Sequence, residues 1–527
     1  MASSTQELEW GNVNMKQNNA DYMNIPKEKF AFCNDSENLH DKRLETKPVG
    51  YFQDAMMRFA KNKSSVTAAF IILLLVLFAI FAPILGSTNY TQQQTDTMYL
   101  QYNKLLPKWD LFAWAGWDGC SEETINKNDY LKLMAIEAET GMSPVVEVYK
   151  ADYQSDNKSA IGTYYDVKID SYVRNGMMFL TLSPDQYEDL QNWQEKTGIQ
   201  VIFPAVDSSK ITTNTLKNDA NIWYECNQKG VPVTKNGKYV DIYSRTYNDG
   251  GYDSLRIEGD DGSLKYAQIS GDSSAVSYKV RVLKNTFFQY RYGHEASFIF
   301  GTNAFGQDIF TRLGGAARFS LIFAICISAI NLVIGAIYGA IEGYYGGIID
   351  LALERVSDIL NGVPFMVVTT LFQLHLANKV GVIPSLLFAF VLTGWIGMAS
   401  RTRMQFYRYK NQEYVLAART LGAKDFRIMF KHIFPNAIGT LVTGSVLVIP
   451  GVIFSEGNLT YLGIVNLDSA TMTSVGSMLS SGQAFLTTYP HIILFPAVFI
   501  SLLMISFNLF GNGLRDAFNP SLRGTEE

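Results

Sequence analysis

Six apolar runs dominate the pattern of hydrophobic and polar positions along the 527-residue chain. Each run is about 20 residues long and lacks charged side chains; they cover residues 66–85, 319–341, 359–377, 380–400, 433–455 and 492–513. A helix of this length crosses roughly 30 Å of hydrocarbon. The pattern therefore predicts six transmembrane helices, with both chain ends on one side of the membrane. Gly362 and Pro364 should kink the third helix.

Between the first two runs, the polar segment 87–300 has the patterns of a folded domain. Its one clear helix, 184–196, follows Ser183 as the cap and has Pro184 at its first position. Turn signals separate Val-, Ile-, Tyr- and Thr-rich stretches, which predict strands at 145–149, 164–173, 199–203, 239–247, 255–257, 264–269 and 275–288. The segment is expected to form an α+β domain inserted after the first span, 65–86.

Two shorter segments are amphipathic. Residues 51–63 predict an interfacial helix that leads into the first span, and together with the polar tail they form a segment 1–64. Residues 301–318 predict a short helix on the outer surface, with Asp308 pairing with Arg312 at i+4.

The distribution of Lys and Arg orients the spans. Basic residues crowd the segment before the first span and the loop between the fourth and fifth spans, whereas residues 433–514 contain none. Positive charge marks the cytoplasmic side. Both termini, 1–64 and 517–527, are therefore predicted to be cytoplasmic, and the inserted domain is predicted to be extracellular. The net charge of −5 decides nothing, because it sums compartments that share no solvent.

The basic loop 411–436 has two amphipathic halves. Tyr414, Ala418 and Leu421 recur at helical spacing before Gly422, which is expected to end the first helix. The second half keeps the helical spacing of apolar residues, and Pro435 is expected to close it. An amphipathic loop lying on the membrane surface is the alternative interpretation.

At these residues the chain resembles the cytoplasmic "EAA" coupling loop of importer-type ABC permeases, in which two alanines precede a glycine and a later Ile-x-Pro. The usual acidic residue before the alanines is replaced by Leu416, and Glu413 lies three positions earlier, as in the peptide/nickel branch. The resemblance implies a type I ABC importer fold with a core at 319–516. It also implies that these residues contact an ATPase: Glu413, Tyr414, Ala417, Ala418, Gly422, Ala423, Phe426, His432 and Pro435.

Other segments narrow the resemblance to C-type oligopeptide permeases. YFQDAMMRFAKNK at 51–63 resembles their amino-terminal elbow, GTNAFGQDIFTR at 301–312 their signature before the second span, and 169–207 the insert of some Gram-positive members. The resemblance implies a bacterial plasma-membrane importer of oligopeptides. Its implied partners are a B-type permease, two ATPases that bind ATP and Mg, and an extracellular peptide-binding lipoprotein. Dipeptides, peptide pheromones or nickel chelates are alternative cargoes.

Other function classes fit the sequence less well. No GxxxxGK[ST], HExxH or GxSxG motif and no His/Cys cluster is present, so no enzyme activity, bound cofactor or metal is expected in this chain. An ion channel or sensor would need an acidic ring or a repeated filter segment. A nucleic-acid partner is not expected either.

A few polar residues and cysteines leave alternatives open. Asn331, Gln373, His375 and Glu456 lie in or beside apolar runs, where they would line a translocation path or form interhelical hydrogen bonds. Cys120 and Cys226 in the extracellular segment would form a disulfide or stay as two buried thiols.

Overall fold

The computed structural model describes residues 51–86, 104–154, 162–207, 219–221, 255–271, 276–469 and 472–518. The chain divides into two compact units, 1–54 and 55–527, and the contacts discussed below lie within the second. The predicted strand at 239–247 and the chain ends, 1–50 and 519–527, lie outside the described residues.

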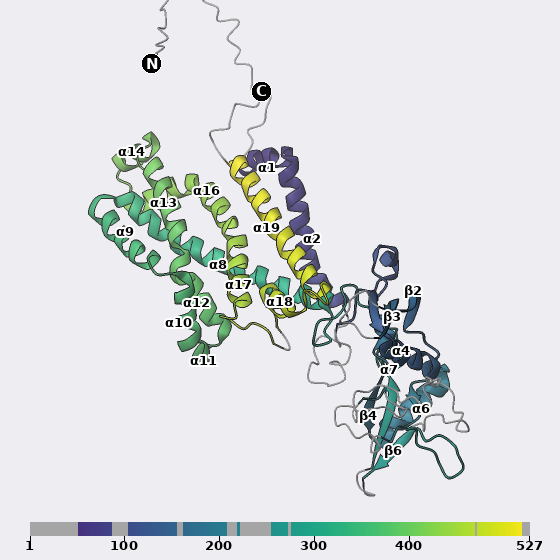
Figure 1. The fold of residues 1–527 in the computed structure, drawn as a ribbon. Helices are drawn as coiled ribbons and strands as arrows, with labels where there is room; N and C mark the ends of the chain where they lie inside the picture. Colours follow the sequence, from purple (N-terminus) through teal and green to yellow (C-terminus); the bar gives the residue numbers. More distant parts are fainter. Residues whose placement is uncertain are drawn as a thin grey trace, which may run out of the picture. The chain divides into compact units, whose positions relative to one another are not determined.

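Long helices form a large part of the described chain (Figure 1). Five are long and apolar enough to cross a membrane: α2 (Lys63–Leu85), α8 (Ile309–Tyr345), the run α12–α13 (Val382–Gly394 and Ile396–Tyr409), the run from α15 to α17 (Asp425–Tyr461), and α19 (His491–Phe518). A sixth span is formed if α9 (Gly347–Asn361) and α10 (Phe365–His375) count as one helix bent by 72°. The bend lies at the predicted kink, and six spans agree with the sequence pattern.

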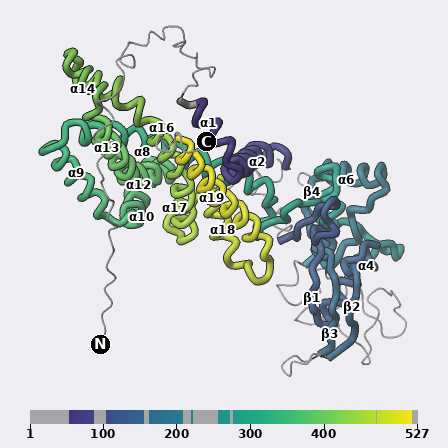
Figure 2. Tube along the Cα trace, turned by 90° about the horizontal axis from the view of Figure 1, so that it is seen from above, coloured from purple at the N-terminus to yellow at the C-terminus, as the bar shows by residue number. Residues whose placement is uncertain are grey.

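Helix α8 packs against α13 through a stripe of small residues. Gly335, Gly339 and Gly343 recur every fourth position, so they share one face of α8. A Cβ atom added at Gly339 would lie 2.0 Å from the carbonyl oxygen of Ala399 on α13. The two backbones therefore touch, as expected where small residues replace bulky ones between membrane helices. Figure 2 shows α8 and α13 side by side.

The start of α8 differs from the sequence prediction. No separate amphipathic helix forms at 301–318; instead α8 begins at Ile309 and continues without a break into the span. Asp308 caps this helix by accepting hydrogen bonds from the backbone amides of Phe310 and Thr311. The predicted Asp308–Arg312 pair is wrong, because the cap occupies the carboxylate and Arg312 pairs with Asp468 instead.

The described residues between α2 and α8 form two antiparallel sheets with helices. The first sheet has the order β1-β3-β2 and contains β1 (Cys120–Asn126), β2 (Val145–Gln154) and β3 (Thr163–Asp170). In the second, β7 (Ser277–Leu283) pairs with β4 (Met177–Leu182), β5 (Ile202–Phe203) and β6 (Ala267–Ser270). The helices are α4 (Lys127–Thr140), α5 (Ser171–Arg174), α6 (Pro184–Thr197) and α7 (Lys284–Tyr292), with a short 3-10 helix η3 (Asp110–Ala115) before β1.

The helix α6 is confirmed with its cap, since Ser183 and Gln186 form a reciprocal capping box. The sequence patterns did not indicate β1, α4 and β4. The predicted strand 275–288 is wrong beyond Leu283, where the chain turns into α7. Thr286, Phe287 and Phe288 are β-formers by composition, but in α7 they pack inward against the rest of the segment.

Candidate functional site: the loop segment 411–436

The first half of the segment is α14 (Glu413–Thr420), which is held by a single buried side chain. Val415 is completely buried and belongs to a cluster with Ala340 of α8, Phe406 of α13 and Ile428. The helix has no other buried residue. Tyr414, Leu416 and Ala417 of the same helix are exposed, and Ala418 is half-buried.

Gly422 ends this half, as the sequence predicts. Its φ of +81° lies in the left-handed region that favours glycine. The turn is closed by two backbone hydrogen bonds, from the amide of Leu421 to the carbonyl of Ala417 at 3.0 Å and from Ala423 to Ala418 at 3.1 Å. A glycine here reverses the chain while α14 keeps its carbonyls satisfied.

The second half continues directly into a membrane helix. The short helix α15 (Asp425–Arg427) passes through a π-helical turn, η5 (Ile428–Ile433), into α16 (Phe434–Val446). The prediction that Pro435 closes this half is wrong: Pro435 lies in the first turn of α16. The wider π turn, in which the amide of Phe434 bonds to the carbonyl of Met429, accommodates the proline ring and its missing N–H.

Apolar side chains are exposed on the surface of the segment that points away from the rest of the protein. Leu421 is 88% exposed and Phe426 is 70% exposed, and Tyr414 and Leu416, which project from different sides of α14, are about half exposed. These four residues are called the apolar face below. Opposite them, Val415, Ile428, Met429 and Ile433 are buried. The segment thus places one apolar side inside the protein and leaves a second one uncovered, which is typical of an interaction surface.

The end of α8 holds both halves of the segment. Tyr344 donates a hydrogen bond to Asp425 at the start of α15, and the guanidinium of Arg419 in α14 lies 5.9 Å from the centroid of the Tyr344 ring. A further hydrogen bond joins the two halves: the side-chain amide of Asn436 donates to the hydroxyl oxygen of Tyr414 at 3.2 Å. Burial raises the pKa of Tyr414. None of these contacts was predicted, because Tyr344 is separated by 81 positions from Asp425.

A charged cluster lies beside this junction. Arg403 of α13 pairs with Asp350 at 2.6 Å and with Glu354 at 2.8 Å, both on α9, and Tyr407 donates a 2.5 Å hydrogen bond to Asp350. Lys410 donates to the carbonyl of Gly343 at 2.9 Å. The cluster fixes the helix that leads into the segment against α8 and α9. Two carboxylates of α9 therefore bind α13.

The other predicted ATPase contacts are placed as follows. Glu413, Ala417 and Pro435 are exposed, whereas Ala418, Ala423 and His432 are half-buried. Leu416 and Leu421, which the resemblance did not single out as contacts, are part of the exposed face. Their exposure depends on which side of α14 carries Val415, and helical spacing alone does not determine that.

The four residues proposed for a translocation path are not brought together. Asn331 is buried where α8 meets Gly394, and Glu456 is buried on α17 (Val448–Tyr461), where it accepts a 3.2 Å hydrogen bond from Ser320. Gln373 donates to the carbonyl of Val382, and His375 is exposed. Their part in transport stays a prediction.

The cysteine prediction also stays open. Cys120 lies half-buried at the start of β1, and its candidate partner Cys226 lies outside the described residues. Among the described residues, no group of three His, Cys, Asp or Glu side chains is placed to hold a metal ion.

Two family models match the chain. Residues 331–524 match the model described as "binding-protein-dependent transport system inner membrane component", and residues 50–107 match the "N-terminal TM domain of oligopeptide transport permease C". The first match contains the whole segment 411–436. The second contains α1 (Tyr51–Lys61) and α2.

Named relatives agree with these matches. The oligopeptide transport system permease protein of Bacillus subtilis is 43% identical over 42% of this chain and 72% of its own length. The dipeptide transport system permease protein of the same organism is 40% identical over 42% of this chain and 69% of its own length. An inward-facing structure of the MetNI methionine ABC transporter aligns with a TM-score of 0.33 and 15% identity, covering 40% of this chain and 96% of that chain.

Proposed function

The chain belongs to the family of binding-protein-dependent transport system inner membrane components and is a permease subunit of an ABC importer, and from this we propose that it imports oligopeptides and is driven through residues 411–436. The peptide cargo is supported by the relatives, which are named as oligopeptide and dipeptide permeases. The observation that supports the driving role of residues 411–436, which is to receive force from the ATPases, is the apolar face.

The apolar face fits a groove on a soluble partner. Four large apolar side chains stand out from a basic segment, and the helices behind them are rigidly attached to α8 and α13 through Val415 and Tyr344. A partner that covers the face removes this apolar area from water. Movement of the partner is then transmitted to the spans, because the segment continues into α16 without a flexible linker.

In the proposed assembly this chain and a B-type permease form the path, and two ATPases bind ATP and Mg on the cytoplasmic side. An extracellular lipoprotein delivers the peptide. The clustering of Lys and Arg in 401–431 supports a cytoplasmic position for the segment, and the α+β segment between α2 and α8 would then face the outside. Closure of the ATPases would shift the segment and alternate access to the path.

Leu421→Ser tests the driving role. The change removes the most exposed side chain of the apolar face and touches no buried residue, so the chain should insert normally while the purified complex loses ATPase subunits and peptide uptake. Ile348→Ser on α9 is the matched control, because Ile348 is 86% exposed but lies outside the segment. Equal ATPase retention and uptake in wild type and Leu421→Ser would refute the docking role.

Dipeptide import is the second candidate, because one relative is named as a dipeptide permease. Uptake of labelled peptides of graded length into a deletion strain, with and without this chain, separates the two. Uptake limited to dipeptides would overturn the oligopeptide proposal and leave the driving role intact.

A further inference from the structure

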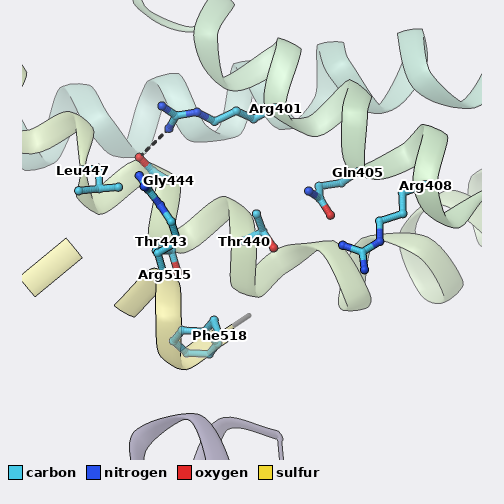
Figure 3. Close-up of a pocket in the computed structure, with 9 residues that line it drawn as sticks. All are labelled: Arg401, Gln405, Arg408, Thr440, Thr443, Gly444, Leu447, Arg515 and Phe518. Atoms are coloured by element: carbon cyan, nitrogen blue, oxygen red, sulfur yellow. Dashed lines mark hydrogen bonds between the residues drawn. The ribbon is translucent and has the colours of Figure 1, made fainter. Parts of the chain in front are cut away.

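A pocket lined by arginines lies between α13, α16 and α19. Its volume is about 370 Å³, and Arg401 and Arg408 of α13 and Arg515 of α19 contribute to its walls (Figure 3). This volume falls in the range of roughly 300–1,000 Å³ that is typical of small-molecule sites. The pocket is separate from the apolar face and from the charged cluster around Arg403.

The pocket side of α13 differs from its opposite side. Arg401, Gln405 and Arg408 follow one another at i, i+4 and i+7, so they share one face of the helix. Arg403, on another face, is neutralised by Asp350 and Glu354. In the described part of the chain, by contrast, no carboxylate lies within ion-pair distance of any of the three pocket arginines. The pocket thus concentrates positive charge that the described residues do not compensate.

The geometry of the arginines is partly fixed. Arg401 donates a 3.0 Å hydrogen bond to the carbonyl oxygen of Gly444, as Figure 3 shows, and the Arg408 guanidinium lies 5.6 Å from the ring of Tyr409. Each guanidinium has five donors, so most of them remain available for a ligand. Planar arginine forks match the oxygens of phosphate and bind them bidentately.

Two further features point to a phosphate that carries a larger organic group. Leu447 and Phe518 add apolar lining on the same pocket, which an inorganic ion would not use. The buried Oε1 of Gln405 has no hydrogen-bond partner, and a hydroxyl group of a ligand would satisfy it. A phospholipid with a glycerol headgroup has all three elements: a phosphodiester anion, hydroxyl groups and apolar acyl chains.

We propose that this pocket binds the headgroup of an anionic phospholipid from the inner leaflet. The inference rests on the proposed topology, in which these helix ends face the cytoplasm, but not on the identity of the cargo. Basic pockets between membrane helices on the cytoplasmic side commonly bind anionic lipid headgroups. Because α13 leads directly into residues 411–436, a bound lipid ties the end of α19 to the helix that precedes the apolar face.

The test uses the purified complete transporter in detergent, titrated with phosphatidylglycerol, phosphatidylcholine or inorganic phosphate. Phosphatidylglycerol should raise the thermal unfolding midpoint of the wild type by roughly 2–4 °C, and the other two should not. The triple variant Arg401→Gln, Arg408→Gln, Arg515→Gln should lose the rise. Arg355→Gln is the matched control, since Arg355 is exposed and pairs with Asp358 outside the pocket.

A second variant guards against misfolding of the triple variant. Thr440→Trp leaves all three arginines in place but fills the pocket from the exposed side of α16, so it should also lose the rise. An equal rise in wild type, triple variant and Thr440→Trp would overturn the proposal. A rise with inorganic phosphate alone would overturn the proposal in favour of a free-anion site. If phosphatidylglycerol gave no rise because an acidic segment of a co-purified subunit filled the pocket, the pocket would be a protein contact instead. The thermal unfolding midpoint is measured without peptide uptake. The lipid proposal can therefore fail while the proposed transport function holds, and the reverse.

Discussion

Tyr344, in the last turn of α8, donates a 2.7 Å hydrogen bond through its phenolic oxygen to Oδ1 of Asp425, the first residue of α15. This bond joins a long span to the segment that is proposed to receive force from an ATPase. The Arg419 guanidinium lies beside the same ring, so one side chain contacts both halves of the segment. Tyr344 is therefore a positioning residue for transport in the proposed mechanism.

Tyr344→Phe should loosen the segment without unfolding the protein. A hydrogen bond to a charged group contributes about 1.5–3 kcal/mol, less where water can replace it, so ATPase activity stimulated by substrate should fall roughly threefold to tenfold. Basal ATPase activity and the amount of assembled complex should not change. Tyr345→Phe is the control, because its ring packs on Tyr344 and is half exposed. Equal stimulation in both variants would contradict the positioning role.

The loss of peptide uptake caused by substitutions at Gly422 should follow backbone strain alone. A Cβ added at Gly422 meets no atom within 4 Å, but the φ of +81° costs an ordinary residue about 1–2 kcal/mol. Peptide uptake should therefore fall in the order Gly422→Asn, Gly422→Ala, Gly422→Val, with membrane insertion unchanged. Gly315→Ala, at an equally open but helical position, should behave as wild type. Uptake by Gly422→Val that matches Gly422→Asn would argue against this explanation.

Glu139→Gln should destabilise the α+β segment strongly. Glu139 pairs with Arg256 and, at 2.9 Å, with Arg281, whose side chain is completely buried and whose pKa burial lowers to about 10. Removing a carboxylate that pairs with the completely buried Arg281 weakens the neutralisation of a buried positive charge, and breaking a buried pair typically costs about 3–5 kcal/mol. Hydrogen exchange of the β7 amides in the full chain measures the loss. Glu147→Gln, at an exposed position on β2, should leave β7 protection unchanged.

The Cys120 thiol should react slowly below alkaline pH. Burial, with smaller contributions from Asp118 and Asp170, raises its pKa to about 11. Only the thiolate reacts, so its alkylation rate should rise about tenfold per pH unit from pH 7 to 10 instead of levelling near pH 9. The measurement uses reduced protein whose other three cysteines are replaced by serine.

Asp118→Asn should shift the same profile to lower pH, because it removes a nearby negative charge and releases Lys168, which pairs with Asp118 at 2.5 Å. Asp261→Asn, an exposed change elsewhere in the segment, should leave the profile unchanged. A plateau near pH 9 in the protein that keeps Asp118 would contradict the raised pKa. In a separate measurement on the chain with all four cysteines, alkylation of Cys120 that requires prior reduction would support the Cys120–Cys226 disulfide.

The sequence by itself determined the features that depend on local information. The apolar runs match the thickness of a bilayer whatever their neighbours are, the capping box around Ser183 satisfies its own helix end, and Gly422 supplies a conformation that other residues adopt at a cost. For the same reason the break near Gly362 and Pro364 was predictable.

Only the tertiary structure decided how these elements use their side chains. Val415 and Leu421 look equivalent in sequence, but packing against α8 and α13 buries the first and exposes the second. Arg403 and Arg408 lie five positions apart on one helix, yet the first meets carboxylates of α9 and the second faces the pocket. The helical period fixes which residues share a face, but burial and pairing depend on residues that are distant in the chain and meet only when the helices pack.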